Sequence, residues 1–218
     1  MLRIQKEGNQ MRIIILFGKP GAGKGTMIDK FLEEKGDLWT SVSTGSIIRN
    51  AIKSGTELGL KAKAYADSGK LAPDEIIVPI VKEALEELED TNVEGVFLDG
   101  FPRTVAQAKM MKELNIIPDR VFDLYVEDEE VILRLSKRRV CPNCGKTYST
   151  GTYNHPKVEW ICDDCGNDLI KRKDDAPDVV RERLKVFAKE TAPVVQTLEE
   201  MGFTVEPIFP DSVLAEII

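Results

Sequence analysis

Short apolar runs alternate with longer amphipathic stretches along most of this chain. Compact apolar runs predict buried strands, and apolar residues that recur every three or four positions predict helices. The predicted strands are Ile13–Phe17, Leu38–Val42, Gly95–Asp99, Val121–Val126 and Phe203–Ile208. The predicted helices are Met27–Glu34, Ser46–Lys53, Glu57–Asp67, Asp74–Leu88 (with Asp74 as its N-cap), Thr104–Leu114, Asp128–Arg139 and Pro177–Met201. This alternation predicts an α/β fold, a parallel sheet flanked by helices on both faces.

A glycine-rich turn joins the first predicted strand to the first predicted helix. Its sequence is Gly18-Lys19-Pro20-Gly21-Ala22-Gly23-Lys24-Gly25-Thr26. Glycines let successive backbone N–H groups point inward, and the helix N-terminus adds partial positive charge. Lys24 adds a full charge, so the turn predicts a P-loop for the phosphates of ATP, formed by Gly21, Ala22, Gly23, Lys24, Gly25 and Thr26. The alternative is a turn that only closes a βα unit.

The alternation stops between Arg139 and Lys171, in a segment that contains every cysteine of the chain. They form two Cys-x2-Cys pairs, each followed by a glycine, at Cys141, Cys144, Cys162 and Cys165. Four thiolates at this spacing favour tetrahedral Zn²⁺, and a closed shell of four thiolates makes a zinc ion structural rather than catalytic. Two disulfides are the alternative, which a reducing compartment disfavours. Iron in place of zinc stays open, because a set of four thiolates suits both metals.

His155, the only histidine of the chain, lies between the two cysteine pairs. Four thiolates already complete a tetrahedral shell, so we expect His155 to be a surface loop residue rather than a metal ligand. No other histidine is available as a general base. The chemistry expected of this chain therefore needs little acid–base catalysis.

A carboxylate ends the predicted strand Gly95–Asp99. Asp99 would lie at the carboxyl edge of a parallel sheet, beside the phosphate site, where it could hold Mg²⁺ through water. Helix capping is the alternative role for Asp99. Arg103 would project into the same crevice. Further arginines flank the cysteine segment on both sides, at Arg134, Arg138, Arg139, Arg172 and Arg181. Each alone predicts a solvated charge, but together they could deliver guanidinium groups to phosphates when the segment closes.

Composition narrows the choice of function. The chain has 218 residues and a formal net charge of −7, whereas nucleic-acid-binding proteins usually have the opposite balance. The sequence contains no apolar run near the ~20 residues of a membrane helix, and no secretory signal is visible at its start. We expect one domain with inserts, monomeric and cytoplasmic, with neither nucleic acid nor a membrane as partner.

Taken together, these motifs resemble the adenylate kinase family, specifically its bacterial long-lid type with a zinc-bearing lid. The resemblance runs from Met11 to about Phe209. It is carried by Gly18–Thr26, Ser43-Thr44-Gly45 with Arg49, Gly69-Lys70-Leu71, Asp99–Thr104 with Gln107, Arg134 with Arg138-Arg139, and Arg172-Lys173-Asp174-Asp175 with Arg181. It implies a P-loop nucleoside-monophosphate-kinase-like core (1–42, 73–137 and 173–218), a helical monophosphate-binding insert (43–72) and a zinc-binding lid (138–172).

The resemblance implies the reaction ATP + AMP ⇌ 2 ADP, with Mg²⁺ as cofactor and a structural Zn²⁺. The residues implied to bind AMP are Thr44, Arg49, Lys70, Leu71, Ala72, Gly100, Arg103, Gln107, Arg172 and Arg181. Those implied to clamp the transferring phosphoryl group are Lys24, Arg138, Arg172 and Arg181. Arg134, with Arg138, is implied to contact ATP, Arg134 by packing on the adenine.

Two residues depart from the family pattern, and a third departs from the common P-loop pattern. Lys19 stands where an alanine is common and adds a charge at the mouth of the site. Ser46 replaces the usual aspartate after Ser-Thr-Gly. Gly25 stands where a P-loop usually has Ser or Thr, which weakens the case for Thr26 as a Mg²⁺ ligand.

Four alternatives follow. A UMP/CMP kinase is disfavoured by Thr44 and by the long lid. A GTP-using relative is disfavoured by the cysteines, although the donor nucleotide is not readable from the sequence. A zinc-ribbon nucleic-acid-binding ATPase is disfavoured by the net charge. A kinase-like regulatory protein without turnover is disfavoured by the intact set of charges.

Overall fold

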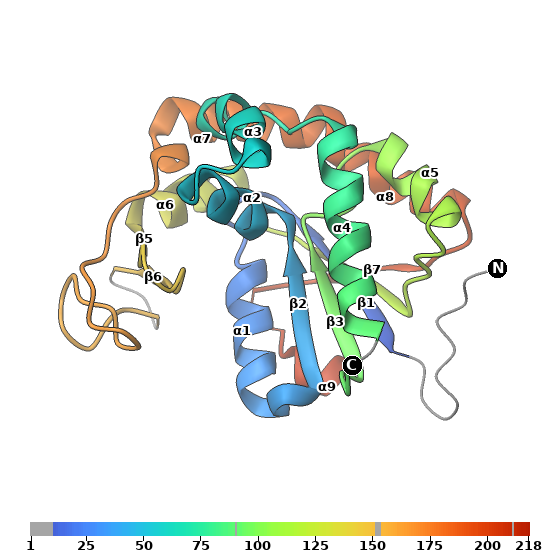
Figure 1. The fold of residues 1–218 in the computed structure, drawn as a ribbon, viewed down its shortest axis with the longest axis horizontal. Helices are drawn as coiled ribbons and strands as arrows, with labels where there is room; N and C mark the ends of the chain where they lie inside the picture. Colours follow the sequence, from blue (N-terminus) through green and yellow to red (C-terminus); the bar gives the residue numbers. More distant parts are fainter. Residues whose placement is uncertain (1–10, 90, 151–153, 211) are drawn as a thin grey trace.

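A parallel sheet forms the centre of the computed structural model, which describes residues 11–89, 91–150, 154–210 and 212–218. Within these residues the strand order is β2-β3-β1-β4-β7, and every neighbouring pair is parallel. The strands are β1 (Arg12–Gly18), β2 (Trp39–Ser43), β3 (Gly95–Asp99), β4 (Arg120–Leu124) and β7 (Val205–Ile208) (Figure 1). The predicted fold class is therefore confirmed. The first ten residues of the predicted core lie outside the described part.

Helices cover both faces of the sheet because side chains alternate between the faces of a strand. Ile13 and Ile15 of β1 pack with one group of helices, whereas Ile14 and Leu16 pack with the other. On the first face lie α4 (Asp74–Glu89), α5 (Val105–Glu113) and α8 (Ala192–Glu200). On the second lie α1 (Lys24–Lys35), α6 (Asp128–Lys137), α7 (Pro177–Val186) and the short α9 (Leu214–Ile217). Two-sided burial explains why the strands read as continuous apolar runs.

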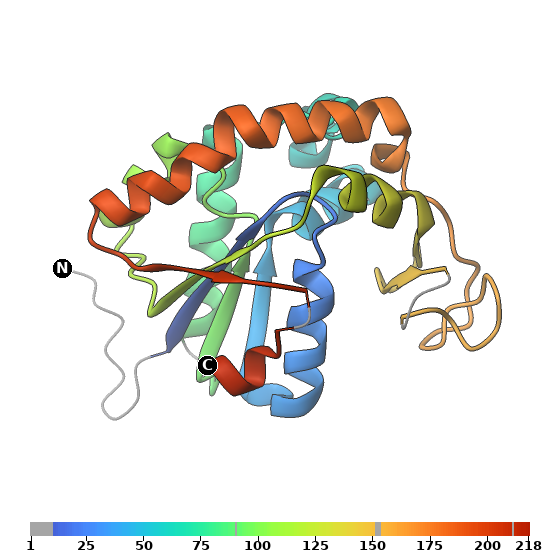
Figure 2. The same cartoon turned by 180° about the vertical axis from the view of Figure 1, so that it is seen from behind.

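The predicted helix Pro177–Met201 is one helical run with an irregular middle. A π-helical turn, η3 (Phe187–Thr191), separates α7 from α8 (Figure 2). Pro193 lies just after this turn, and a proline has no N–H to give to a carbonyl one turn earlier. The turn directs Thr191 inward, where its hydroxyl donates to the backbone carbonyl of Arg103 at 2.9 Å. This helical run therefore supports the loop that follows β3.

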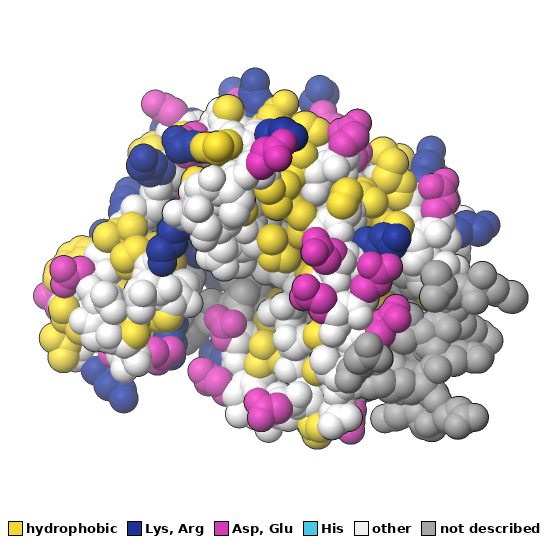
Figure 3. Space-filling view, in the orientation of Figure 1, with side chains coloured by type: hydrophobic (Ala, Val, Ile, Leu, Met, Phe, Trp, Pro, Cys, Tyr) yellow, Lys and Arg dark blue, Asp and Glu magenta, His cyan; other side chains and the backbone are white. Residues whose placement is uncertain are grey.

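Two excursions leave the sheet. The insert, residues 43–72, contains α2 (Thr44–Lys53) and α3 (Glu57–Ser68). The lid, residues 138–172, contains the antiparallel hairpin of β5 (Arg138–Val140) and β6 (Thr147–Ser149). Single-turn 3-10 segments, η1 (Gly36–Leu38) and η2 (Lys173–Asp175), precede β2 and α7. In the space-filling view the lid is a separate lobe with a furrow between it and the rest of the molecule (Figure 3). A search of the described residues finds no helix long and apolar enough to cross a membrane.

The prediction that one helix runs from Asp128 to Arg139 is wrong at its end. Helix α6 stops at Lys137, because Arg138 has extended backbone angles (φ −65°, ψ 138°) and begins β5. Arg134 and Arg138, which are four residues apart, therefore do not lie on one face of a continuous helix. The change from helix to strand at Arg138 marks the root of the lid.

Candidate active site

A crevice of about 1260 Å³ opens where the sheet, the insert and the lid meet. All but two of the residues predicted to bind nucleotide line it. Ala22 is buried in the core beneath the P-loop, and Arg181 points elsewhere. The residues that do line the crevice are Gly21, Gly23, Lys24, Gly25, Thr26, Thr44, Arg49, Lys70, Leu71, Ala72, Asp99, Gly100, Arg103, Gln107, Arg134, Arg138 and Arg172.

The P-loop leaves a helix N-terminus open toward the crevice. Helix α1 begins at Lys24 after a left-handed Gly23, and no side-chain cap is found there among the described residues. The first N–H groups of a helix need acceptors, and their partial positive charge favours an anion. The Lys24 ammonium folds over the loop and donates to the carbonyls of Gly18 (2.6 Å) and Lys19 (2.9 Å). The loop is therefore built to surround a phosphate.

The carboxyl ends of β2 and β3 bring two polar side chains to the base of the crevice. Ser43 and Asp99 are register partners, and the Ser43 hydroxyl donates to Asp99 Oδ2 at 3.1 Å. The charge of Asp99 also raises the pKa of Lys24, which partly offsets the lowering that burial causes. This places a hard oxygen ligand beside the P-loop, which fits a Mg²⁺ ion held with its waters.

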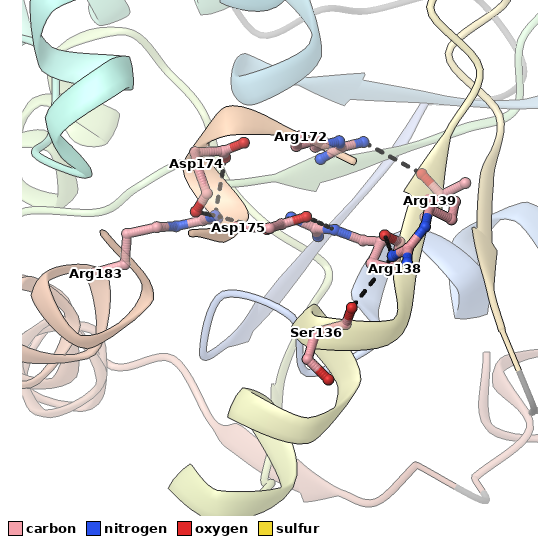
Figure 4. Close-up of polar contacts among 8 residues, drawn as sticks. Ser136, Arg138, Arg139, Arg172, Asp174, Asp175 and Arg183 are labelled. Atoms are coloured by element: carbon pink, nitrogen blue, oxygen red, sulfur yellow. Dashed lines mark hydrogen bonds and ion pairs between the residues drawn. The ribbon is translucent and has the colours of Figure 1, made fainter. Parts of the chain in front are cut away.

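Arg138, at the start of the lid, and Arg183 of α7 meet around the buried carboxylate of Asp175 (Figure 4). Arg138 makes a bidentate pair with Asp175, at 2.8 and 2.5 Å, and the Asp175 side chain is 0% exposed. Arg183 of α7 lies 3.5 Å from the same carboxylate and 2.8 Å from Asp174. A bidentate pair fixes the plane of a guanidinium group. The two aspartates therefore hold Arg138 and Arg183 in place at the edge of the crevice.

Arg172 completes this group from the other end of the lid. Its Nη2 donates to Thr147 Oγ1 at 3.2 Å. Its Nε is buried and has no hydrogen-bond partner among the described residues. A buried donor without an acceptor is costly and rare in native proteins. An anionic oxygen in the crevice would satisfy it.

Three cations that line the crevice have pKa values below their ordinary range. Burial lowers the pKa of Lys24 to about 8. The charge of Asp99 raises this pKa in part, and neighbouring arginines lower it further. Burial, followed by the charges of Arg138 and Arg49, lowers the pKa of Arg172 to about 9. Burial likewise lowers the pKa of Arg183 to about 10, although Asp174 opposes it. Like charges gathered in a partly desolvated cleft destabilise each other unless an anion binds between them. The electrostatics therefore point to a polyanionic ligand.

The insert and the loop after β3 form the second half of the crevice. Thr44 is buried and donates to the Gly100 carbonyl at 2.9 Å. Gly100 has φ +83°, and a Cβ there would clash with the Arg103 guanidinium group and lie 2.8 Å from Thr44 Oγ1, so only glycine fits. Burial lowers the pKa of both Arg49 and Arg103. Two guanidinium groups, both desolvated by burial, thus lie in the part of the crevice under the insert.

Two predicted arginines are not brought to the site: Arg139, whose guanidinium group lies 4.9 Å from the centre of the Trp160 ring, and Arg181. Of these two, Arg181 is the one implied to clamp the phosphoryl group. It lies on the outer side of α7, 64% exposed, in a pair with Asp178 at 2.9 Å. Arg183 lines the crevice in its place. Residues two apart on a helix point in nearly opposite directions, so only one of the two could face inward. The buried Val180 was the available signal, because Arg183 is three residues beyond it and Arg181 only one.

Arg134 lies over the P-loop from α6. Its Nη1 donates to the Ala22 carbonyl at 2.7 Å, and its Nε pairs with Glu130 at 2.8 Å. Both contacts hold the guanidinium group against the loop, at the crevice wall. Its predicted role, packing on an adenine, stays a prediction that the position allows.

Lys19, the unusual residue of the P-loop, points away from the crevice toward α6. Its ammonium pairs with Asp128 at 2.5 Å and lies 5.8 Å from the centre of the Tyr125 ring. Lys19 is not among the lining residues of the crevice. Its charge therefore ties the P-loop to the first turn of α6.

The four cysteines converge in the lid. Their sulfur atoms all lie within 4.8 Å of one another, and none of the cysteines is in a disulfide. The two knuckles repeat one backbone pattern: Gly145 N–H donates to Cys141 O at 3.0 Å, and Gly166 N–H donates to Cys162 O at 2.9 Å. Tetrahedral zinc with ~2.3 Å bonds places sulfurs about 3.8 Å apart. The thiolate set fits such an ion, and the exposed His155 is not in the cluster.

Sequence reasoning gave no role to several residues that shape the site. Asp174 and Asp175 were recognised in a motif without a role. Thr191, which supports the Arg103 loop, carried no local signal, because the contact joins positions 88 residues apart. The helical period is a signal for Arg183, because it places this residue three positions after the buried Val180.

Comparison with known proteins agrees with the geometry. The family model for adenylate kinase matches residues 16–203. An adenylate kinase of Chloroherpeton thalassium is 45% identical over 197 residues, covering 88% of each chain. One of Acetivibrio thermocellus is 47% identical over 196 residues, again covering 88% of each chain. One of Archaeoglobus fulgidus is 44% identical over 193 residues and 87% of each chain. With a family match over most of its length, this chain belongs to the adenylate kinase family.

Proposed function

We propose that this protein catalyses the reversible transfer of a phosphoryl group from ATP to AMP, giving two ADP. The observation that carries the proposal is the convergence of cations from the core, the insert and the lid on one crevice that spans the P-loop and the insert. Arg172, whose Nε has no partner among the described residues, is near enough to Arg138 and Arg49 to feel their charges, which supports an anion there. Phosphoryl transfer needs in-line alignment and charge neutralisation more than acid–base groups. The residues of the crevice suit that task without a histidine.

The donor half is proposed to lie on the P-loop. The open N–H groups at Gly23–Thr26 and the Lys24 ammonium would hold the phosphates of ATP, and Arg134 would contact the adenine. Arg138, fixed by Asp175, and Arg183 would neutralise charge on the moving group. Arg183 takes the place first given to Arg181.

The acceptor half is proposed to lie under the insert. Arg49 and Arg103 would hold the phosphate of AMP, and Arg172 would bridge toward the donor. Lys70, Leu71 and Ala72 line the same pocket, with Thr44 and Gln107 on the side of the base. Holding two substrates in line can lower the barrier by ~7–11 kcal/mol.

Mg²⁺ is proposed to enter with ATP. Asp99 and Ser43 supply oxygen atoms next to Lys24, a donor set that hard cations prefer. When bound, the ion would neutralise phosphate charge, and Asp99 would hold it through its water shell. A zinc ion in the four-cysteine cluster would stabilise the lid and take no part in the transfer.

Residues 43–72 and 138–172 are proposed to close over the substrates as two mobile pieces on a fixed core. Closure matters because water in the site would accept the phosphoryl group. Lys53 of α2 already donates to the Pro142 carbonyl of the lid at 2.7 Å, across the mouth of the crevice. Opening after the reaction is then a candidate for the slow step.

An assay of ADP formation from ATP plus AMP tests the proposal. We expect Mg²⁺-dependent turnover, with AMP preferred over UMP and CMP as acceptor. Greater activity with UMP would make the chain a pyrimidine-monophosphate kinase instead. ATP hydrolysis without acceptor, together with a mobility shift of DNA or RNA at low salt, would favour the zinc-ribbon ATPase.

A further inference from the structure

The amide side chain of Gln107 is held at both ends. Gln107 is 1% exposed, yet it lines the acceptor half of the crevice. Its Nε2 donates to Asp74 Oδ1 at 2.7 Å, and its Oε1 accepts the backbone N–H of Arg103 at 2.7 Å. A backbone N–H can only donate and an ionised carboxylate can only accept, so these partners leave the amide one orientation. One lone pair of the oxygen accepts from the backbone, and one N–H is committed to Asp74.

The carboxylate of Asp74 is itself fixed. Thr104 Oγ1 lies 3.3 and 3.4 Å from its two oxygens and donates to them. The same hydroxyl, at the N-cap of α5, accepts a hydrogen bond from the backbone N–H of Gln107 at 3.1 Å. Asp74 is not the predicted N-cap but the first residue of α4, directly after the insert. The network therefore joins the root of the insert, the start of α5 and the loop that carries Arg103.

This geometry decides which group Gln107 shows to a ligand. Nε2 has two N–H bonds and one is directed at Asp74, so the second N–H, on this fixed side of the amide, has no partner among the described residues and is left as a donor for a ligand. Without Asp74 only the Arg103 N–H would hold the amide, and Nε2 would lose the acceptor that fixes its direction. Asp74 is not among the lining residues of the crevice and would act only through Gln107.

We propose that Asp74 is a positioning residue that makes Gln107 a fixed N–H donor to the base of the monophosphate, and so sets base preference at the acceptor site. The inference rests on the proposed function. Adenine and cytosine have an unprotonated ring nitrogen on the pairing edge, whereas guanine and uracil carry an N–H there. A fixed donor binds the first pair and faces a second donor in the other pair, which is a repulsive contact.

The test compares kcat/KM for AMP, CMP, GMP and UMP in the wild type and in Asp74→Ala. One hydrogen bond contributes about 1 kcal/mol, so we expect the AMP:GMP and AMP:UMP ratios to fall by about fivefold to tenfold. The AMP:CMP ratio should change by less than about twofold, since both bases offer an acceptor. Asp74→Asn retains an acceptor oxygen and should restore the wild-type ratios. Glu75→Ala, which removes an exposed charge from the same helical turn, should leave them unchanged.

A binding experiment separates this inference from the proposed function. The side-chain amide signals of Gln107, assigned by their loss in Gln107→Met, are followed by NMR during titration with AMP and GMP. We expect AMP to shift one of the two amide protons in the wild type and in Asp74→Asn, and Asp74→Ala to lose this selectivity. If AMP binds this way but no turnover is found, the proposed function fails and the inference stands. Equal losses for all four bases, unchanged ratios, or no response of Gln107 to AMP would overturn it.

Discussion

At the scale of single residues, Lys24 shows how the crevice is prepared for a ligand. Its pKa is lowered by burial from 10.5 to about 8, so the free protein loses this charge as the pH rises through that value. Phosphate binding needs the ammonium form and should return the pKa toward its ordinary value. We therefore expect ATP affinity to fall by up to about tenfold per pH unit above pH 8.

Calorimetry at pH 8.5 in two buffers of different ionisation enthalpy measures this linkage. Up to about one proton should be taken up per ATP bound. In Lys24→Arg the side chain stays charged over this range, so the decline and the proton uptake should both shrink. A flat affinity from pH 7.5 to 9.5 in the wild type would mean that Lys24 does not contact the phosphates.

Arg183 and Arg181 form a matched pair for a second prediction, because they lie two residues apart on α7 and differ in direction. Arg183→Ala should lower kcat/KM by about 100-fold or more, since it removes a donor aimed at developing charge. Arg181→Ala should lower it by less than about twofold, since its ion pair is exposed. Steady-state kinetics and melting temperatures of both variants provide the comparison. Similar losses in the two would refute the assignment of Arg183 to the phosphates.

Much of the site at this scale was predictable because its residues are adjacent in the chain. A glycine-rich turn followed by Lys24 and a helix predicts a phosphate-binding geometry from local sequence alone. The end of an apolar run likewise predicts that Asp99 lies at the carboxyl edge of the sheet. The motif alone does not distinguish Arg181 from Arg183. The helical period does, because the two residues point to opposite sides of α7 and only Arg183 lines the crevice. Contacts between distant segments, such as Thr191 with Arg103, leave no mark in either local sequence.

At the scale of elements, the lid has little apolar core of its own, so we expect its folding to depend on a metal held by the four cysteines. Its buried apolar cluster is small and consists of Tyr148, Leu169 and two cysteines, with Cys165 packed against it. Zinc can contribute on the order of 10 kcal/mol to the folding of such a module. We expect Cys141→Ser to lower zinc affinity by more than about 100-fold, beyond the loss of an outer-shell partner. Its melting curve should show the lid unfolding at a lower temperature.

His155→Ala is the control for the lid, because His155 lies between the knuckles but outside the sulfur cluster. Metal content by atomic spectroscopy should stay at one zinc per chain in this variant. Iron in the preparation would change the metal assignment. Retention of one zinc per chain in Cys141→Ser would contradict the four-cysteine site.

Some element boundaries and irregular turns could not be predicted from the sequence pattern. Apolar periodicity found every strand of the sheet and every helix that packs on it except α9, a single helical turn. Periodicity predicts that α6 extends to Arg139, because arginine has good helix propensity. Pairing with β6 instead places Arg138 and Arg139 in a strand. The π-helical turn at Phe187–Thr191 was likewise invisible, because it depends on Pro193 and on a tertiary hydrogen bond.

At the scale of the whole molecule, the net charge of −7 hides a strongly cationic interior surface. Burial lowers the pKa of Lys24, Arg49, Arg103, Arg172 and Arg183 within one crevice, and neighbouring positive charges add to the lowering for all of them except Arg103. Sequence-wide charge could exclude classes of partner but could not locate this surface. The fold creates it by bringing the roots of two excursions to one edge of the sheet.

A molecule built to join two nucleotides should bind a mimic of both far more tightly than either alone. Two adenosines linked through five phosphates would fill the donor and acceptor halves together, and we expect an affinity at least about 100-fold above that for ATP. Arg103→Met should reduce this affinity toward that of ATP, because only the donor half would remain. The mimic should also raise the melting temperature in proportion to its binding free energy. Calorimetry that finds the mimic no tighter than ATP would reduce the crevice to a single nucleotide site, and the proposed reaction would fail with it.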